Sequence, residues 1–254
     1  MDSTKKIALI TGGSRGLGRN MAFALANDGV DVILTYRSDK KSADETITEV
    51  ERRGGKAIAL QLDTGNIANF PTFASTVREA LARIWSQDRI DYLVNNAGLG
   101  AMSPFADTTE AVFDELMNVH LKGVFFLTQA MLPLIADGGR ILNLSSGLTR
   151  FSFPGYSAYA MMKGGIEVFT RYLAKELGSR GIAVNTLAPG AIETDFGGGI
   201  VRDNAEVNKM IAGQTALGRV GVPDDIGPLA AALLSGNARW VNGQRIEASG
   251  GMLL

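Results

Sequence analysis

The sequence predicts an α/β fold in which a parallel sheet of about seven strands is doubly wound, with helices on both faces. Short, nearly continuous apolar runs recur along the chain, and longer stretches with a helical hydrophobic period separate them. Parallel strands have such apolar runs because helices cover both of their faces. The alternation implies right-handed crossovers and a single domain over residues 1–254. The expected strands are 7–11, 30–36, 57–62, 92–95, 140–144, 183–187 and 245–248, and the expected helices are 17–27, 43–53, 73–84, 110–134, 158–177 and 225–234.

The composition excludes several classes of function. The net charge is −1, so the chain has no positive field to hold a nucleic acid backbone or an anionic membrane surface. Because the chain contains no cysteine, disulfides, thiolate nucleophiles and cysteine-ligated metals are excluded, and we expect no metal site. No apolar run approaches the roughly 20 residues that span a bilayer. We therefore expect a soluble cytoplasmic protein.

A glycine-rich turn follows the first expected strand and opens the first expected helix. Its glycines have a Gly-x3-Gly-x-Gly spacing. Glycine lets the backbone approach a diphosphate closely, and a helix N-terminus supplies amide donors to it. The alternative is a tight turn that binds no ligand. The residues that would contact a dinucleotide here are Gly12, Ser14, Arg15, Gly16, Leu17 and Gly18.

The end of the second strand indicates which nicotinamide cofactor would bind. A carboxylate at this place would accept from the ribose hydroxyls and repel a 2′-phosphate. The chain has Arg37 and Ser38 instead, and an arginine can pair with a phosphate through two charge-assisted hydrogen bonds. Arg15 can reach the same place, whereas Asp39 weakens the argument. We expect NADP(H) rather than NAD(H); the alternative is that Arg37 is a solvated surface charge.

Tyr159 and Lys163 are four residues apart on an expected helix, so they lie on one helical face. A free tyrosine has a pKa of about 10, and a nearby positive charge favours the phenolate. At about 5 Å and an effective dielectric of about 20, the attraction is roughly 3 kcal/mol, or about two pKa units. We therefore expect a lowered pKa and general acid–base catalysis by Tyr159. Upstream, Ser145 and Ser146 end a strand, where either hydroxyl could hold a carbonyl oxygen or cap a turn.

In these motifs the chain resembles the short-chain dehydrogenase/reductase family over essentially its whole length, which implies a Rossmann-type sheet. The glycine turn, the segment from Asn95 to Gly98, the Tyr159–Lys163 pair and the segment from Pro189 to Thr194 follow one another in the family's order. Asn242-Gly243-Gln244 and Gly250-Gly251 are also similar to family motifs. The resemblance is greatest to the 3-oxoacyl-carrier-protein reductase and glucose dehydrogenase branches.

The resemblance implies a role for each matching residue. It selects Ser146 over Ser145 as the catalytic serine, because Ser146 lies thirteen positions before Tyr159. It also implies that Asn118, in an Asn-x4-Gly pattern with Gly123, holds a water that links Lys163 to solvent. Asp63 would contact the adenine, and Asn95 and Gly98 would pass under the adenosine. Ile192 and Thr194 would contact the nicotinamide. The full implied set of cofactor contacts after the second strand is Arg37, Ser38, Asp63, Thr64, Asn95, Ala97, Gly98, Tyr159, Lys163, Pro189, Gly190, Ile192 and Thr194.

Other expectations concern the substrate and the assembly. Residues 195–218 should form a lid on a hinge at Gly197–Gly199, and Phe151, Phe153 and Tyr156 either line an apolar substrate pocket or pack a loop. We interpret His120 as structural, because residues two apart on a helix face different sides. The family resemblance implies a homo-oligomer, a tetramer or dimer. The sequence favours a carbonyl reductase acting on a small molecule; a related NAD-dependent sugar or alcohol dehydrogenase, an epimerase and a non-enzymatic cofactor-sensing protein are the alternatives.

Overall fold

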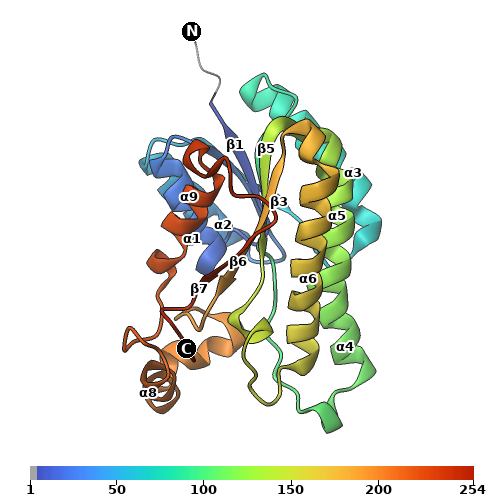
Figure 1. The fold of residues 1–254 in the computed structure, drawn as a ribbon. Helices are drawn as coiled ribbons and strands as arrows, with labels where there is room; N and C mark the ends of the chain where they lie inside the picture. Colours follow the sequence, from blue (N-terminus) through green and yellow to red (C-terminus); the bar gives the residue numbers. More distant parts are fainter. Residues whose placement is uncertain (1–4) are drawn as a thin grey trace.

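A computed structural model describes residues 5–254 and contains one seven-stranded sheet whose strands are all parallel (Figure 1). Its strand order is β3-β2-β1-β4-β5-β6-β7. The doubly wound fold predicted from the sequence is therefore confirmed. The strands are β1 (Ile7–Ile10), β2 (Asp31–Tyr36), β3 (Ala57–Gln61), β4 (Ile90–Asn95), β5 (Ile135–Leu144), β6 (Ala183–Pro189) and β7 (Arg245–Ala248).

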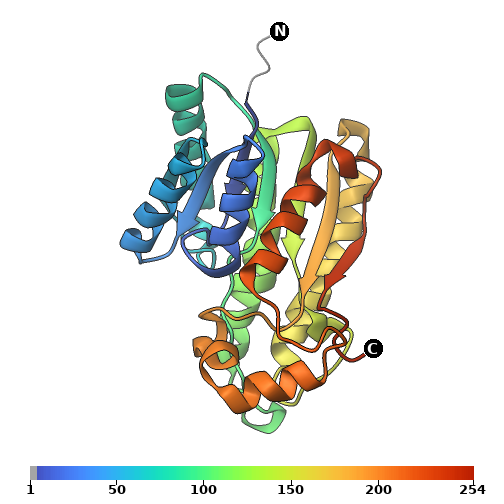
Figure 2. The ribbon, with the colours of Figure 1, turned by 90° about the vertical axis from the view of Figure 1, so that its left-hand side faces the viewer.

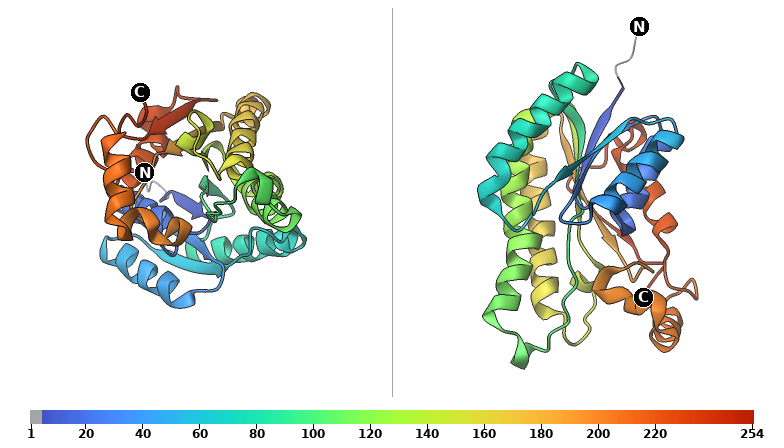
Figure 3. Two further views of the ribbon diagram at one scale, coloured as in Figure 1. Left: turned by 90° about the horizontal axis from the view of Figure 1, so that it is seen from below. Right: turned by 180° about the vertical axis from the view of Figure 1, so that it is seen from behind.

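Helices cover both faces of the sheet (Figures 1 and 2). One face carries α1 (Gly16–Asn27), α2 (Lys40–Arg52) and α9 (Gly227–Leu234). The other carries α3 (Phe70–Ala80), α5 (Gly123–Met131) and α6 (Ser157–Glu176), with α4 (Glu110–Met117) packed on α6. The views from below and from behind in Figure 3 show the same two layers.

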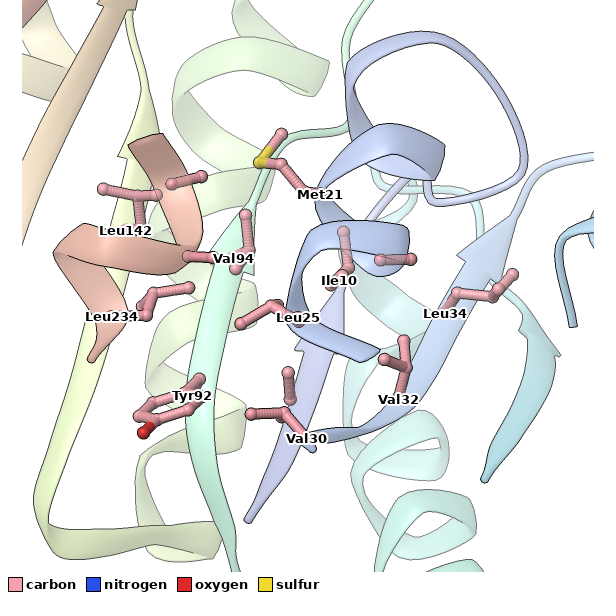
Figure 4. Packing of buried hydrophobic residues seen from close by; sticks show 14 of the residues in the cluster. Ile10, Met21, Leu25, Val30, Val32, Leu34, Tyr92, Val94, Leu142 and Leu234 are labelled. Atoms are coloured by element: carbon pink, nitrogen blue, oxygen red, sulfur yellow. The ribbon is translucent and has the colours of Figure 1, made fainter. Parts of the chain in front are cut away.

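The sheet divides the core into two hydrophobic clusters, as the alternation of side chains along a strand requires. In β1, Ala8 and Ile10 belong to the cluster under α1 and α9, whereas Ile7 and Leu9 belong to the cluster under α3 and α5. Figure 4 shows the first cluster, in which Met21 and Leu25 of α1 pack on the strands. Because both faces are buried, the inner strands are mainly apolar, which explains the runs in the sequence, and their buried polar residues such as Asn95 and Asn143 are hydrogen-bonded.

Three elements differ from the sequence prediction. β5 begins at Ile135, five residues before the expected start, and its pairing with β4 shifts between Ile90 and Tyr92. The helix expected over 110–134 is divided into α4, a π turn over Asn118–Lys122, α5 and a 3-10 turn. The lid segment contains two helices that the sequence analysis did not predict, α7 (Ile200–Asp203) and α8 (Ala205–Gly213).

The carboxyl ends of the strands all lie at the lower end of the molecule, where α8 and the start of α4 also lie (Figures 1 and 2). The strand order reverses between β1 and β4, which pair with each other while β2 and β5 lie on opposite sides. Open parallel sheets bind ligands beyond the carboxyl ends at such a switch point. The glycine turn follows β1 and the Asn95–Gly98 segment follows β4, so both border this place. No helix among residues 5–254 is long and apolar enough to cross a membrane.

Candidate active site

The glycine turn is joined tightly to the segment after β4. The Thr11 hydroxyl accepts hydrogen bonds from the amides of Asn96 and Ala97, at 2.9 and 3.0 Å. The Asn96 side chain donates back to the carbonyl oxygens of Thr11 and Gly12, at 2.8 and 3.1 Å. A Cβ on Gly18 would overlap the Gly12 carbonyl oxygen and lie 2.5 Å from Asn96 Nδ2. The turn therefore needs glycine here for packing, whatever it binds.

The N-terminus of α1 is open towards the other side of the crevice. Arg15 is its N-cap residue, and no side chain caps the helix, so its first amides have no side-chain acceptor. A Cβ on Gly16 would lie 3.7 Å from the Thr194 Cβ, which places the glycine turn beside the segment after β6. These amides and the bare glycine surface fit a diphosphate, whose charge a helix N-terminus favours. Ser14 is buried beneath the turn, where its carbonyl oxygen accepts from Thr46.

The residues expected at the adenosine end lie together at the ends of β2 and β3. Arg37 Nε is 3.7 Å from an Asp63 carboxylate oxygen, and both side chains are largely exposed. Asp39 caps α2, since its carboxylate accepts from the amide and hydroxyl of Ser42. These hydrogen bonds lower the pKa of Asp39. The acid that weakened the sequence argument is thus committed to a helix cap, and Arg37 remains available to an anion.

The Asn95 side chain lies inside the protein rather than in the crevice. Its amide donates to the Thr128 hydroxyl and to the Asn143 side-chain oxygen, at 2.9 and 2.8 Å, and Asn143 donates in turn to Thr170. Only main-chain atoms of Asn95 can therefore face a nucleotide. The sequence analysis also did not single out Asn96, although its motif contains it, and Asn96 makes the hydrogen bonds that hold the turn.

Tyr159 and Lys163 are both buried on α6, one turn apart. Lys163 Nζ lies 5.7 Å from the centre of the Tyr159 ring and donates to the Leu144 carbonyl oxygen at 2.7 Å. Ser146 lies beside the phenol, and a hydrogen bond from its side chain partly offsets the effect of burial on the Tyr159 pKa. Ser145 instead donates to Glu167 at 2.7 Å. Of the two serines that the residues alone left open, Ser146 is the one next to Tyr159.

Glu167 is a residue that sequence reasoning missed. It accepts hydrogen bonds from Ser145, Thr149 and Arg245, at 2.7, 2.7 and 2.8 Å. These bonds tie the loop that carries Ser146 to α6 and to β7. Glu167 follows Lys163 by four residues, so helical spacing could have placed it beside the site, but nothing in the sequence indicates its partners.

The expected lowering of the Tyr159 pKa is wrong for the protein alone. Burial raises the pKa of Tyr159 above its usual value, and burial also lowers the pKa of Lys163 to about 7. The sequence argument considered the charge of Lys163 and left out desolvation, which disfavours the charged form of both groups. At neutral pH the phenol is therefore protonated.

The depressed pKa of Lys163 predicts a specific pH dependence of stability. The folded value, about 7, lies below the value of 10.5 for a free lysine, so the unfolded chain binds more protons between these limits. The free energy of unfolding then rises with pH above about 7, by up to about 1.4 kcal/mol per pH unit. Urea unfolding from pH 6 to 9.5 should show this rise for the wild type relative to Lys163→Met. Parallel curves for the two proteins would contradict it.

His120 lies on the π turn between α4 and α5, and its side chain contacts Tyr159. Its ring is fully buried, with 5.1 Å between its centroid and that of Tyr159. Asn118, half-buried at the start of the same π turn, makes no side-chain hydrogen bond with the residues that the structure describes. Gly123 lets the Thr64 carbonyl oxygen pack against this helix, where a Cβ would overlap it. The proposed role of Asn118 stays a prediction, and so does the structural interpretation of His120, whose buried ring contacts Tyr159.

The segment expected to form a lid places an aromatic side chain against Tyr159. The ring centroids of Phe196 and Tyr159 are 5.9 Å apart, and a Cβ on Gly100 would lie 3.0 Å from Phe196 Cε1. All three residues Gly197–Gly199 have left-handed φ angles, between 63° and 78°, which side chains other than glycine rarely adopt. Phe151 packs against the cluster formed by Ile211, Val220 and Met252.

An apolar cavity of about 300 Å³ lies beside the site, between the loop before α6 and the segment at Phe105. Phe153 and Tyr156 line it, as expected, and Phe151 does not. No charged residue lines it. The remaining lining residues are Pro104, Phe105, Leu148, Ser152, Pro154, Gly155, Ser157 and Ala160.

Comparison with known proteins finds matches over nearly the whole chain. A family model described as enoyl-(acyl carrier protein) reductase matches residues 12–253. An uncharacterized oxidoreductase of Methylorubrum extorquens is 37% identical over 247 residues, with 97% of each chain covered. A hydroxynaphthalene reductase-like protein, Arp2 of Metarhizium brunneum, is 35% identical over 257 residues, covering 97% of this chain and 94% of the relative.

Two similar solved structures are of reductases. The reductase LugOII, described as catalysing keto-reduction at C1 during lugdunomycin biosynthesis, is 38% identical with a TM-score of 0.94, and 99% of each chain is covered. The angucycline C-6 ketoreductase LanV with bound NADP is 36% identical with a TM-score of 0.93, covering 98% of this chain and 95% of LanV. Since sequence, fold and motif order agree over the whole length, the chain belongs to the short-chain dehydrogenase/reductase family.

Proposed function

We propose that this protein is an NADP(H)-dependent ketoreductase in which Tyr159 is the general acid and base. The observation that carries the proposal is the cluster of a half-buried Ser146 with the buried Tyr159 and Lys163 at the carboxyl end of the sheet. The 36% identity to LanV, a ketoreductase with NADP bound, supports the same cofactor and reaction. The reverse reaction is oxidation of the alcohol.

Each residue of the cluster would have its own role in carbonyl reduction. The Ser146 hydroxyl and the Tyr159 phenol would both donate to the carbonyl oxygen, which fixes and polarises it. Because burial keeps the phenol protonated, Tyr159 can supply the proton as the oxygen gains charge. Lys163, held by the Leu144 carbonyl oxygen, would orient the ribose next to the nicotinamide and favour proton loss from Tyr159. NADPH, when bound, supplies the hydride, which is chemistry of the cofactor itself.

The cofactor's diphosphate would lie on the amides of the glycine turn and the open start of α1. We infer that the exposed guanidinium of Arg37, with Arg15 near it, binds the 2′-phosphate. Asp63 would contact the adenine, and the segment from Pro189 to Thr194 the nicotinamide. The lid with Phe196 would exclude water from the reacting carbonyl.

Replacing Arg37 by alanine should raise the KM for NADPH about 10- to 100-fold and leave the KM for NADH nearly unchanged. Loss of a hydrogen bond to a charged group costs about 1.5–3 kcal/mol, and NADH lacks the phosphate concerned. Arg89→Ala is the matched control, because Arg89 is a partly exposed arginine just before β4, at the opposite end of the sheet. Equal losses with both cofactors, or a wild type that prefers NADH, would contradict the assignment.

Oxidation of NADPH, followed at 340 nm, tests the reaction itself. The panel should contain angucycline ketones and hydroxynaphthalene-type substrates, which the relatives LanV and Arp2 suggest and which an uncharged cavity suits, together with small ketones, aldehydes and β-ketoacyl thioesters. NADH is run in parallel. Turnover of at least one ketone with NADPH is expected. Tight NADPH binding without any turnover over the whole panel would favour a cofactor-sensing protein instead.

We also infer that a second copy of the chain covers the outer face of α5 and α6. Four large apolar side chains on these two helices are 38–62% exposed, and grouped exposed apolar residues often mark an interface; they are Phe125, Phe126, Met161 and Val168. Sedimentation velocity should give a dimer or tetramer, and Val168→Glu should shift it towards monomer. A wild type that is monomeric at micromolar concentration would contradict the inference.

A further inference from the structure

His120 is a completely buried side chain to which the proposed reaction assigns no role. It lies on the π turn between α4 and α5, and its ring meets that of Tyr159 nearly at right angles, at 85°. Buried polar atoms almost always have hydrogen-bond partners, yet Nδ1 of His120 has none among residues 5–254. A side chain kept only for packing would avoid this cost, so the position calls for another explanation.

The main chain after β4 fixes the other side of the ring. Nε2 lies 2.7 Å from the carbonyl oxygen of Leu99, a contact that is attractive only with a proton on Nε2. The Leu99 amide is also directed at Nε2, at 3.2 Å, and could donate to it only in the other tautomer; the shorter contact assigns the proton to Nε2. Burial, together with the nearby charge of Lys163, lowers the pKa of His120 to about 3, so the ring is neutral and Nδ1 carries the lone pair.

Gly98 provides the room for this approach. A Cβ on Gly98 would lie 2.7 Å from His120 Cε1 and 3.3 Å from Nδ1, so any larger residue would displace the imidazole. The segment around Gly98 reaches the site from the end of β4, whereas Tyr159 reaches it from α6. The imidazole contacts both segments.

We propose that His120 is a positioning residue that sets the distance between Tyr159 and the main chain at Gly98 and Leu99. Its consequence for turnover rests on the proposed function, in which Tyr159 supplies the proton. Proton transfer needs the phenol within hydrogen-bond reach of the carbonyl oxygen. A displacement of about 1 Å can cost about 100-fold in rate.

The first test needs no turnover. The chain has a single histidine, so ¹⁵N-histidine labelling of tag-free protein gives the NMR signals of His120 alone. We expect a neutral ring with the proton on Nε2 from pH 6 to pH 8, and signals displaced by Gly98→Ala. A protonated ring, or a proton on Nδ1, would overturn the proposal whether or not the protein is a ketoreductase.

The second test compares two substitutions at the same position. His120→Leu removes the donor to Leu99 and should lower kcat about 10- to 100-fold, with the KM for the ketone and the Kd for NADPH within about twofold of wild type. His120→Gln keeps a donor near the Nε2 position and should recover most of the loss. Equal losses in both variants, or a fall in kcat that tracks NADPH binding and melting temperature, would overturn the proposal. A wild type that reduces no ketone would instead count against the proposed function.

A double-substitution cycle separates the contact from general damage. Gly98→Ala should lower kcat in the wild type, because its Cβ pushes on the imidazole, and should lower it little further in His120→Ala, where that clash is absent. Measured NADPH affinity shows whether Gly98→Ala also disturbs the cofactor. Fully additive losses in kcat would contradict the positioning role.

Discussion

Replacing Tyr159 by phenylalanine should lower kcat by about 10²- to 10⁴-fold while the protein folds normally and still binds NADPH. The substitution removes only the hydroxyl, so the ring still packs between His120 and Phe196. What is lost is the proton donor, which burial keeps protonated at neutral pH. Steady-state NADPH oxidation at 340 nm gives kcat, and titration calorimetry gives the cofactor Kd.

Tyr172→Phe is the matched control for this experiment. It is the same change on the same helix, but Tyr172 is 66% exposed and follows Tyr159 by thirteen residues. It should leave kcat unchanged. If Tyr159→Phe retained a rate within about threefold of wild type, Tyr159 could not be the general acid, whose removal costs at least about 100-fold.

Much of this site could be predicted because its parts are local in sequence. The glycine turn joins one strand to one helix, and Tyr159 and Lys163 share a helical face, so spacing alone places them. The parallel order of the strands then brings these local motifs to one edge of the sheet. The strands are equally predictable, since burial on both faces favours apolar residues at most of their positions.

The parts that escaped prediction depend on contacts between distant segments. The spacing argument put Asn118 on the side of the helix that faces Tyr159 and His120 on the opposite side, whereas in the structure the ring of His120 contacts Tyr159. Asn95 belongs to a recognisable motif, but its side chain donates hydrogen bonds to Thr128 and Asn143. No local sequence pattern indicates these two partners. Of the two helices after the three glycines, α7 has four residues, too few for a periodic signal, whereas α8 has nine residues and a capping Asn204, so its sequence signal was missed.

Replacing Gly18 by alanine should abolish NADPH binding at micromolar concentration and lower the free energy of unfolding by about 1–3 kcal/mol, the usual cost of forcing an extra carbon into a packed site. The new Cβ would overlap the Gly12 carbonyl oxygen and press on Asn96 Nδ2, so the glycine turn must separate from the segment after β4. The same movement would displace the amides on which the diphosphate is expected to lie. Urea unfolding and titration calorimetry measure the two effects.

The control is Gly178→Ala, because Gly178 is exposed and a Cβ there would meet no atom within 4 Å. It should leave NADPH binding unchanged and shift stability by less than about 1 kcal/mol. The pair of measurements also decides between the two interpretations of the glycine turn that the sequence left open. A Gly18→Ala protein that is destabilised but binds NADPH as tightly as wild type would make the turn a packing device only. Loss of binding in the folded variant would place the diphosphate on it.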